Sequence, residues 1–117
     1  MSVPTPDRVQ LARDGFAGPL NCAQAVAAAF RDLSGLTPEQ VEDHKRNGGG
    51  RAPDGTCGAL FAGLELLNDG PQLDAVAAQF ANHTGSTKCR EIRAAKLVSC
   101  AGCVDTAATL LSIALAS

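Results

Sequence analysis

The chain of 117 residues is long enough for one ordinary domain and too short for two domains with separate hydrophobic cores. Hydrophobic residues make up 45% of the sequence, which argues against a disordered chain. A net charge of −2 and an aromatic content of 3% argue against a nucleic-acid-binding surface, which uses clustered positive charge and base-stacking rings.

The first elements in chain order are predicted helices. The polar residues 1–6 are typical of a loose leader, and a short helix follows over 7–16. Asn21 is a suitable cap for a second helix. The apolar residues of this second helix recur at helical spacing, at Cys22, Ala25, Val26, Ala29, Phe30 and Leu33. Thr37 and Gln40 then form a capping box around Pro38, which predicts a short polar helix that ends at Asn47.

Residues 48–63 combine a glycine run, a turn and the start of an apolar helix. Gly48, Gly49 and Gly50 allow a close approach of the backbone to other groups. The turn is formed by the residues before Thr56, which we expect to cap a helix that runs to about residue 68. Cys57 is therefore predicted in the first turn of that helix, on its buried face.

Two or three further helices complete the chain. An amphipathic helix follows Gly70 and ends at Gly85. Cys89 begins a short element over 89–97, and Ser99 precedes a last helix over about 100–115. No strand-like alternation of any length occurs. The sequence therefore predicts an all-α, single-domain helical bundle of about five or six helices over residues 1–117.

The chemical role of cysteines depends on the cellular compartment. The N-terminal residues lack the apolar segment of a signal peptide, and no apolar run reaches the ~20 residues that span a bilayer. We therefore expect a cytoplasmic protein without membrane insertion, whose alanine-rich helix faces would allow a homodimer. Structural disulfides are rare in the cytoplasm, so the five cysteines are better explained as metal ligands or redox thiols.

Several cysteines share one predicted environment. Cys22, Cys57 and Cys100 lie at expected helix starts and on apolar faces, where the helix dipole stabilises a thiolate. Cys100 and Cys103 are three residues apart, which puts both sulfurs on one helix face. Taken alone, Cys22, Cys57 or Cys89 is equally well explained as a small buried hydrophobe. As a set, they predict that Cys22, Cys57, Cys89 and at least one of Cys100 and Cys103 converge.

Other polar residues carry weaker signals. His44 lies in a charged run and is expected in solvent, while His83 lies near a helix end. Neither histidine is assigned a catalytic role. Asp105 follows the cysteine pair and is placed either to tune a thiol or to act as an ordinary first-turn carboxylate.

The cysteine pattern resembles that of the C_GCAxxG_C_C family of redox-active proteins. The matching residues are Cys22, Cys57 with Gly58 and Ala59, Cys89 and Cys100, with the glycine run before Cys57, and the similarity covers about residues 20–113. Two departures are clear. Ala62 stands where the final glycine of the motif belongs, with Gly63 one residue later, and Cys103 is additional. The resemblance implies a helical domain with a four-cysteine redox centre and names no substrate.

Our first hypothesis is that an iron–sulfur cluster is bound by Cys22, Cys57, Cys89 and Cys100, with Cys103 nearby or substituting for one ligand. Gly49, Gly50 and Gly58 would lie beside this cofactor. The function would be electron transfer or redox sensing, with an electron donor or acceptor protein as the partner.

Three alternatives remain open. In the first, the chain is a thiol–disulfide protein that uses Cys100 with Cys103, or Cys57 with a second cysteine, and needs no metal. In the second, the cysteines form a structural zinc module. In the third, the chain is a helical interaction module whose cysteines only pack. No catalytic residue is assigned beyond the redox thiols of the first alternative.

Overall fold

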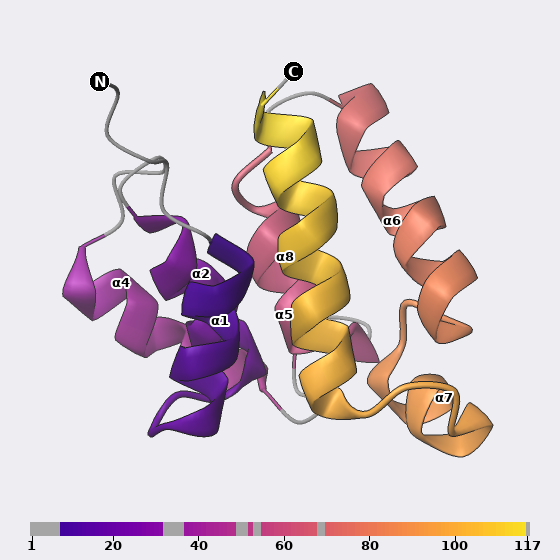
Figure 1. Ribbon diagram of the computed structural model, residues 1–117, viewed down its shortest axis with the longest axis horizontal. Helices are drawn as coiled ribbons and strands as arrows, with labels where there is room; N and C mark the ends of the chain where they lie inside the picture. Colours follow the sequence, from indigo (N-terminus) through magenta and orange to yellow (C-terminus); the bar gives the residue numbers. More distant parts are fainter. Residues whose placement is uncertain (1–7, 32–36, 49–51, 53–54, 68–69, 117) are drawn as a thin grey trace.

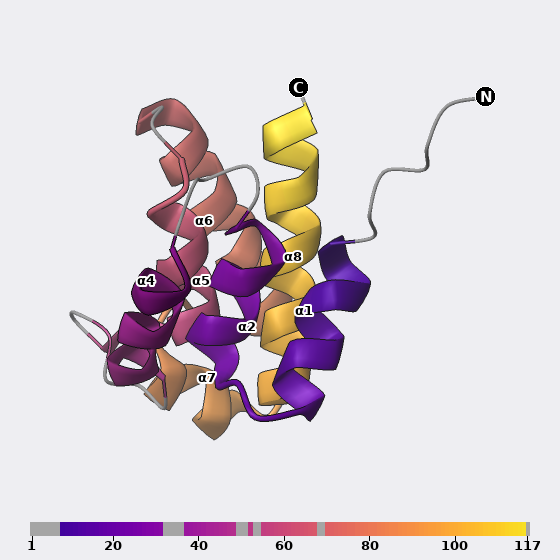
Figure 2. The same ribbon diagram turned by 90° about the vertical axis from the view of Figure 1, so that its left-hand side faces the viewer.

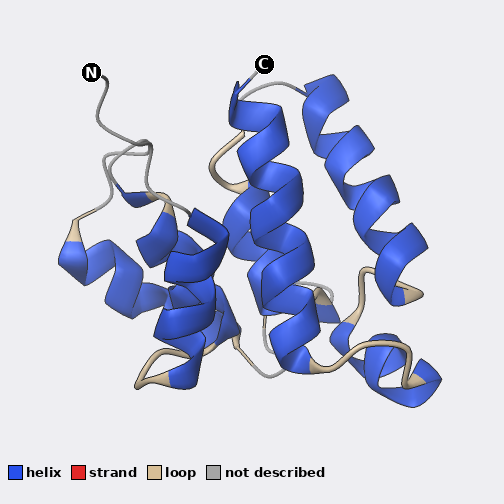
Figure 3. Ribbon diagram, in the orientation of Figure 1, coloured by secondary structure: helices blue, strands red, loops and turns tan. Residues whose placement is uncertain are grey.

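The computed structural model describes residues 8–31, 37–48, 52, 55–67 and 70–116. The predicted leader, Leu33, Gly49 and Gly50 lie outside these residues. The described part of the chain is helical without strands, apart from one isolated bridge between Thr56 and Lys88, which confirms the all-α prediction (Figure 3). It holds seven α-helices and one short 3-10 helix, slightly more than the five or six expected.

The elements in chain order are α1 (Arg8–Ala17), α2 (Cys22–Ala29), α4 (Pro38–Asp43), the 3-10 helix η1 (His44–Asn47), α5 (Gly58–Leu64), α6 (Gly70–Thr84), α7 (Cys89–Ala95) and α8 (Cys100–Ala116). Helix α8 is central, because it contacts α1, α2, α5 and α6 (Figure 1). Helix α7 lies at the end of the bundle where α8 begins, in both views (Figures 1 and 2).

Alanine side chains form much of the core, as the low aromatic content requires. Phe30 and Phe80 are the largest fully buried side chains. Between α5 and α8 the helices approach closely at Gly63, where an added Cβ would lie 2.5 Å from Leu111 Cδ1. Small residues therefore allow α5 to pack directly on the central helix.

The helix cap predicted at Asn21 and the capping box predicted at Thr37 are both present, and Asn21 also forms a complete capping box. The Asn21 side chain accepts a hydrogen bond from the Gln24 backbone at 2.8 Å, and the Gln24 side chain accepts one from the Asn21 backbone at 3.1 Å. Thr37 and Gln40 make the same pair of bonds at the start of α4. Asn21 differs from Thr37 in one respect, because its Nδ2 also donates to the Lys45 carbonyl at 2.8 Å.

Substitution of Asn21 by alanine is expected to lower the free energy of unfolding by about 1–2 kcal/mol, since it removes both a cap and a bond to η1. Thr37→Ala is the matched control and should cost about 0.5–1 kcal/mol, because Thr37 only caps an exposed helix. Urea denaturation of both variants measures the difference. An equal loss in the two variants would contradict a structural role for the bond from Asn21 to η1.

The predicted start of α5 is wrong by one residue. Cys57 itself is the N-cap, and α5 ends at Leu64 rather than near residue 68. Thr56 is not the cap because its segment is extended and pairs with Lys88. The Cys57 backbone N–H donates to the Thr87 carbonyl at 2.8 Å, so the helix cannot begin earlier.

No single described helix has the length and apolar character needed to cross a membrane, although α7 and the first fifteen residues of α8, which are bent by 119°, pass that test as a pair.

Candidate functional site

All five cysteines line one small cavity. Cys22, Cys57, Cys89, Cys100 and Cys103 surround it together with Ile92, Arg93 and Val98. The cysteines come from the starts of α2, α5, α7 and α8, which gather at the lower end of the bundle (Figures 1 and 2). The cavity volume is about 30 Å³, enough for one water molecule. The predicted convergence of the cysteines is confirmed.

Pairing of two distant segments brings the starts of α5 and α7 together. The bridge between Thr56 and Lys88 and the bond from Cys57 N–H to Thr87 align the residues just before these helices. A turn after α6 positions the second segment, with Gly85 at φ 97° and the Thr84 hydroxyl 2.7 Å from the Ser86 carbonyl. Cys57 and Cys89 are therefore delivered to the same place although they are far apart in sequence.

Gly58 allows α2 and α5 to meet at the cavity. An added Cβ on Gly58 would lie 2.5 Å from the Asn47 carbonyl oxygen and 2.9 Å from Cys22 Sγ. No ordinary side chain fits that space without movement of the backbone. The small residue after Cys57 thus sets the position of Cys22 relative to Cys57.

The cysteines differ in exposure. Cys57 and Cys103 are buried, Cys22 and Cys89 are half-buried, and Cys100 is exposed, and no disulfide links them. The expectation that Cys100 faces inward is therefore wrong. Cys100 is the first residue of α8, which follows a surface loop, and the buried face of this helix begins one turn later at Cys103 and Val104.

Cys57 and Cys103 are the two buried cysteines of the cavity, and each alters the pKa of the other. The Cys103 thiol, as a hydrogen-bond donor, lowers the pKa of Cys57 from 9.0 to about 7. The backbone N–H groups of Leu60 and Ala59 also lower this pKa, whereas burial raises it. Cys57 makes no regular side-chain capping bond to α5. The same hydrogen bond to Cys57, together with burial, raises the pKa of Cys103. Cys57 is therefore the thiolate of the pair and Cys103 the proton donor.

Arg93 stands beside the more exposed cysteines. The negative charge of Cys89, the hydrogen bond with Cys100 and the charge of Cys100 raise the pKa of Arg93. Burial raises the pKa of Cys89, and the Arg93 charge partly opposes this. Sequence reasoning missed Arg93. Its position four residues after Cys89 on a helix places both side chains on one face and was the available signal.

His44 is buried, so the prediction that it lies in solvent is wrong. The η1 turn directs its ring toward α5, where it meets the Phe61 ring edge-on at a centroid distance of 6.4 Å. Its Nε2 lies 3.6 Å from a Glu65 carboxylate oxygen, and Nδ1 lies 3.1 Å from Asn47 Nδ2. This histidine fixes η1 against α5. His83, by contrast, is exposed on α6.

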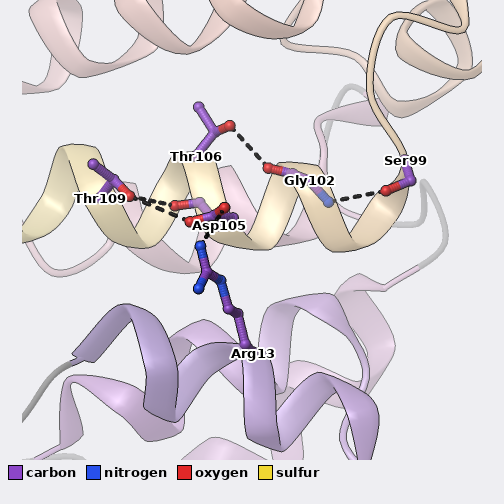
Figure 4. A network of polar contacts seen from close by, with 6 residues as sticks. All are labelled: Arg13, Ser99, Gly102, Asp105, Thr106 and Thr109. Atoms are coloured by element: carbon purple, nitrogen blue, oxygen red, sulfur yellow. Dashed lines mark hydrogen bonds and ion pairs between the residues drawn. The ribbon is translucent and has the colours of Figure 1, made fainter.

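Asp105 belongs to a polar network on the outside of α8 (Figure 4). Its carboxylate accepts a hydrogen bond from Arg13 of α1 at 2.7 Å, and the Thr109 hydroxyl donates to the Asp105 carbonyl at 2.8 Å. In the same network, the Ser99 hydroxyl caps the Gly102 N–H at 3.1 Å. The bond from Arg13 joins α1 to α8, and none of these contacts involves a cysteine.

Within the described ranges, no three Cys, His, Asp or Glu side chains form a group arranged to hold a metal ion. No protein-family model, curated protein or solved structure matches the chain. The family resemblance of the cysteine pattern stays a prediction.

Proposed function

We propose that this chain is a thiol–disulfide redox protein in which Cys57 and Cys103 form the reversible pair. The observation that carries this proposal is that Cys57 and Cys103, the two buried cysteines, lie together in a cavity lined by five cysteines. One member of the pair is held as a thiolate and the other as a thiol, which is the state that disulfide exchange uses. The resemblance to a redox-active family supports the same class of function.

The reaction balances with an external disulfide as the oxidant. Cys57 and Cys103 lose two electrons and join through a new S–S bond. The oxidant gains these electrons, its own S–S bond breaks, and it leaves as two thiols that take up the protein's protons. A redox protein would be the physiological partner. We place the chain in the cytoplasm, where a glutathione or thioredoxin system keeps thiols reduced.

We expect the fully reduced chain, treated with the neutral hydroxyethyl disulfide, to form a Cys57–Cys103 bond. Remaining thiols are blocked with N-ethylmaleimide, and mass spectrometry identifies the linked residues. Cys103→Ala should abolish this bond, whereas Cys89→Ala, which removes a half-buried thiol from the same cavity, should retain it. Five unlinked thiols, or a dominant Cys100–Cys103 bond, would refute the assigned pair.

An iron–sulfur cluster is the second candidate, because a disulfide needs two cysteines and the cavity presents five. Cys22, Cys57, Cys89 and Cys100 would hold the cluster, which would supply one-electron transfer. The ligands of a cluster bind different iron atoms, so they need not surround one point as the ligands of a single zinc ion do. The cavity of about 30 Å³ would have to widen to hold a cluster, so this candidate stands second to the thiol pair.

Anaerobic reconstitution with ferrous iron and sulfide separates these candidates. A brown protein that retains iron and sulfide after desalting supports the cluster, and colourless iron-free protein argues against it. Elemental analysis of the same sample detects zinc. The thiol pair and the cluster compete for Cys57, so a stable cluster should also suppress formation of the Cys57–Cys103 bond.

A further inference from the structure

Arg93 occupies the boundary between the cysteine cavity and solvent. Its side chain lines the cavity, yet the residue is exposed. It lines the same cavity as Cys100, which is the most exposed of the five cysteines. A molecule that reaches the sulfurs through Cys100 therefore meets the Arg93 guanidinium first.

The surface around this boundary is basic. Arg90, Arg93 and Lys96 are all exposed on α7 or at its end, with Glu91 as the one carboxylate in that helix, whereas the whole chain carries a net charge of −2. Across the described part of the chain, no ion pair joins a carboxylate to Arg93. A guanidinium has five N–H donors, so Arg93 can bind a carboxylate through two of them while it stays at the cavity beside Cys100.

The cavity is too small to enclose a disulfide-bearing molecule. Its volume of about 30 Å³ admits a group of the size of one water molecule. Only a reacting sulfur can approach the cysteines, and the rest of the molecule must stay at the boundary beside Arg93. Selectivity would therefore depend on the group next to the reacting sulfur rather than on a deep binding pocket.

We infer that the oxidant of this site is an anionic disulfide, whose carboxylate binds Arg93 while Cys100 makes the first attack. This inference rests on the proposed function.

The Cys100 thiolate bonds to one sulfur of the disulfide, the S–S bond breaks, and the other half leaves as a thiolate. Cys103 then attacks Cys100 Sγ, releases the second thiolate and gives its proton to solvent. The Cys57 thiolate finally attacks Cys103 and returns Cys100 as a thiolate.

The test uses three disulfide probes of different charge on the full chain. Dithiobis(nitrobenzoate) is anionic, dithiodipyridine is neutral at neutral pH and cystamine is cationic. Stopped-flow absorbance gives the rate for the first two, and quenched mass spectrometry identifies the modified cysteine for all three. Arg93→Gln is compared with Arg90→Gln, which removes an exposed arginine of the same helix that does not line the cavity.

We expect Arg93→Gln to slow modification of Cys100 by the anionic probe about tenfold and by the neutral probe less than about twofold. Arg93→Lys should retain most of the preference, high salt should weaken it, and Arg90→Gln should leave it nearly unchanged. An equal loss for all probes, no loss for the anionic probe, or first modification at another cysteine would overturn the inference. The mapping experiment with a neutral disulfide tests the Cys57–Cys103 pair separately, so the two can fail independently.

Discussion

Gly58→Ala is expected to lower the free energy of unfolding by about 2–3 kcal/mol, because the added methyl group has no space. Its Cβ would lie 2.5 Å from the Asn47 carbonyl oxygen, a backbone atom that cannot rotate away. It would also lie 2.9 Å from Cys22 Sγ and 3.2 Å from Ala23 Cβ. Separation of α2 from α5 relieves these contacts, so we also expect Cys22 to react faster with thiol reagents.

Gly70→Ala is the matched control. Both glycines are the first residue of a helix, but an added Cβ on Gly70 meets nothing within 4 Å. This control should change stability by less than about 0.5 kcal/mol or stabilise slightly, since alanine reduces the conformational freedom of the unfolded chain. Urea denaturation and maleimide labelling of Cys22 provide the measurements. Equal stability of the two variants would show that α2 and α5 are not held together at Gly58.

Local sequence signals were sufficient to predict most of the helices. The capping boxes at Asn21 and Thr37 depend on residues three positions apart, and the structure contains both. The all-α class follows from apolar residues at helical spacing and from the absence of strand-like alternation. Such signals fail where a distant segment decides the local conformation. Cys57 is an N-cap rather than a first-turn residue because its N–H bonds to Thr87, thirty residues away.

The convergence of the cysteines was also predictable, but their relative exposure was not. A chain of this length has one core, so cysteines on apolar helix faces must meet. The order of burial depends on where each helix emerges from its loop. Cys100 and Cys103 share a helix face, yet Cys100 lies at the exposed end of α8 and Cys103 is buried one turn further on.

His44 and Arg93 show that a charged segment in the sequence does not by itself predict which side chains are buried or line a site. Both lie in segments rich in charged residues, which usually indicate a solvated surface. The η1 turn buries His44 against Phe61, whereas Arg93 remains exposed and still lines the cysteine cavity. The distinction comes from tertiary packing, because η1 packs against α2 and α5 whereas α7 lies at the end of the bundle.

Cys103→Ala is expected to raise the pKa of Cys57 from about 7 toward 9.0, because the Cys103 thiol is the largest cause of its low value. At pH 7 the Cys57 thiolate would fall from about half of the molecules to the order of 1%. The remaining thiolate is a stronger nucleophile, which offsets part of this loss, so we expect alkylation of Cys57 at pH 7 to slow about fivefold.

The same pair gives the wild-type chain a pH-dependent stability of defined sign. The Cys57 pKa is lowered in the folded chain, so its stabilisation is present above pH 9 and is lost as the pH falls toward 7. The Cys103 pKa is raised, so its stabilisation is present below pH 9 and is lost as the pH increases further. Stability from this pair is therefore greatest near pH 9, and Cys103→Ala should remove that maximum.

Pulsed alkylation with iodoacetamide between pH 5 and pH 10, followed by mass spectrometry, gives the titration midpoint of Cys57 separately from the other thiols. The control is Cys89→Ala, since the Cys89 thiol lines the same cavity but is not among the groups that lower the pKa of Cys57. We expect the Cys57 midpoint near pH 7 in the wild type and in this control, and close to pH 9 in Cys103→Ala. A midpoint near pH 9 in the wild type would mean that Cys103 does not hold Cys57 as a thiolate, and the pair would then lack the asymmetry on which its exchange chemistry depends.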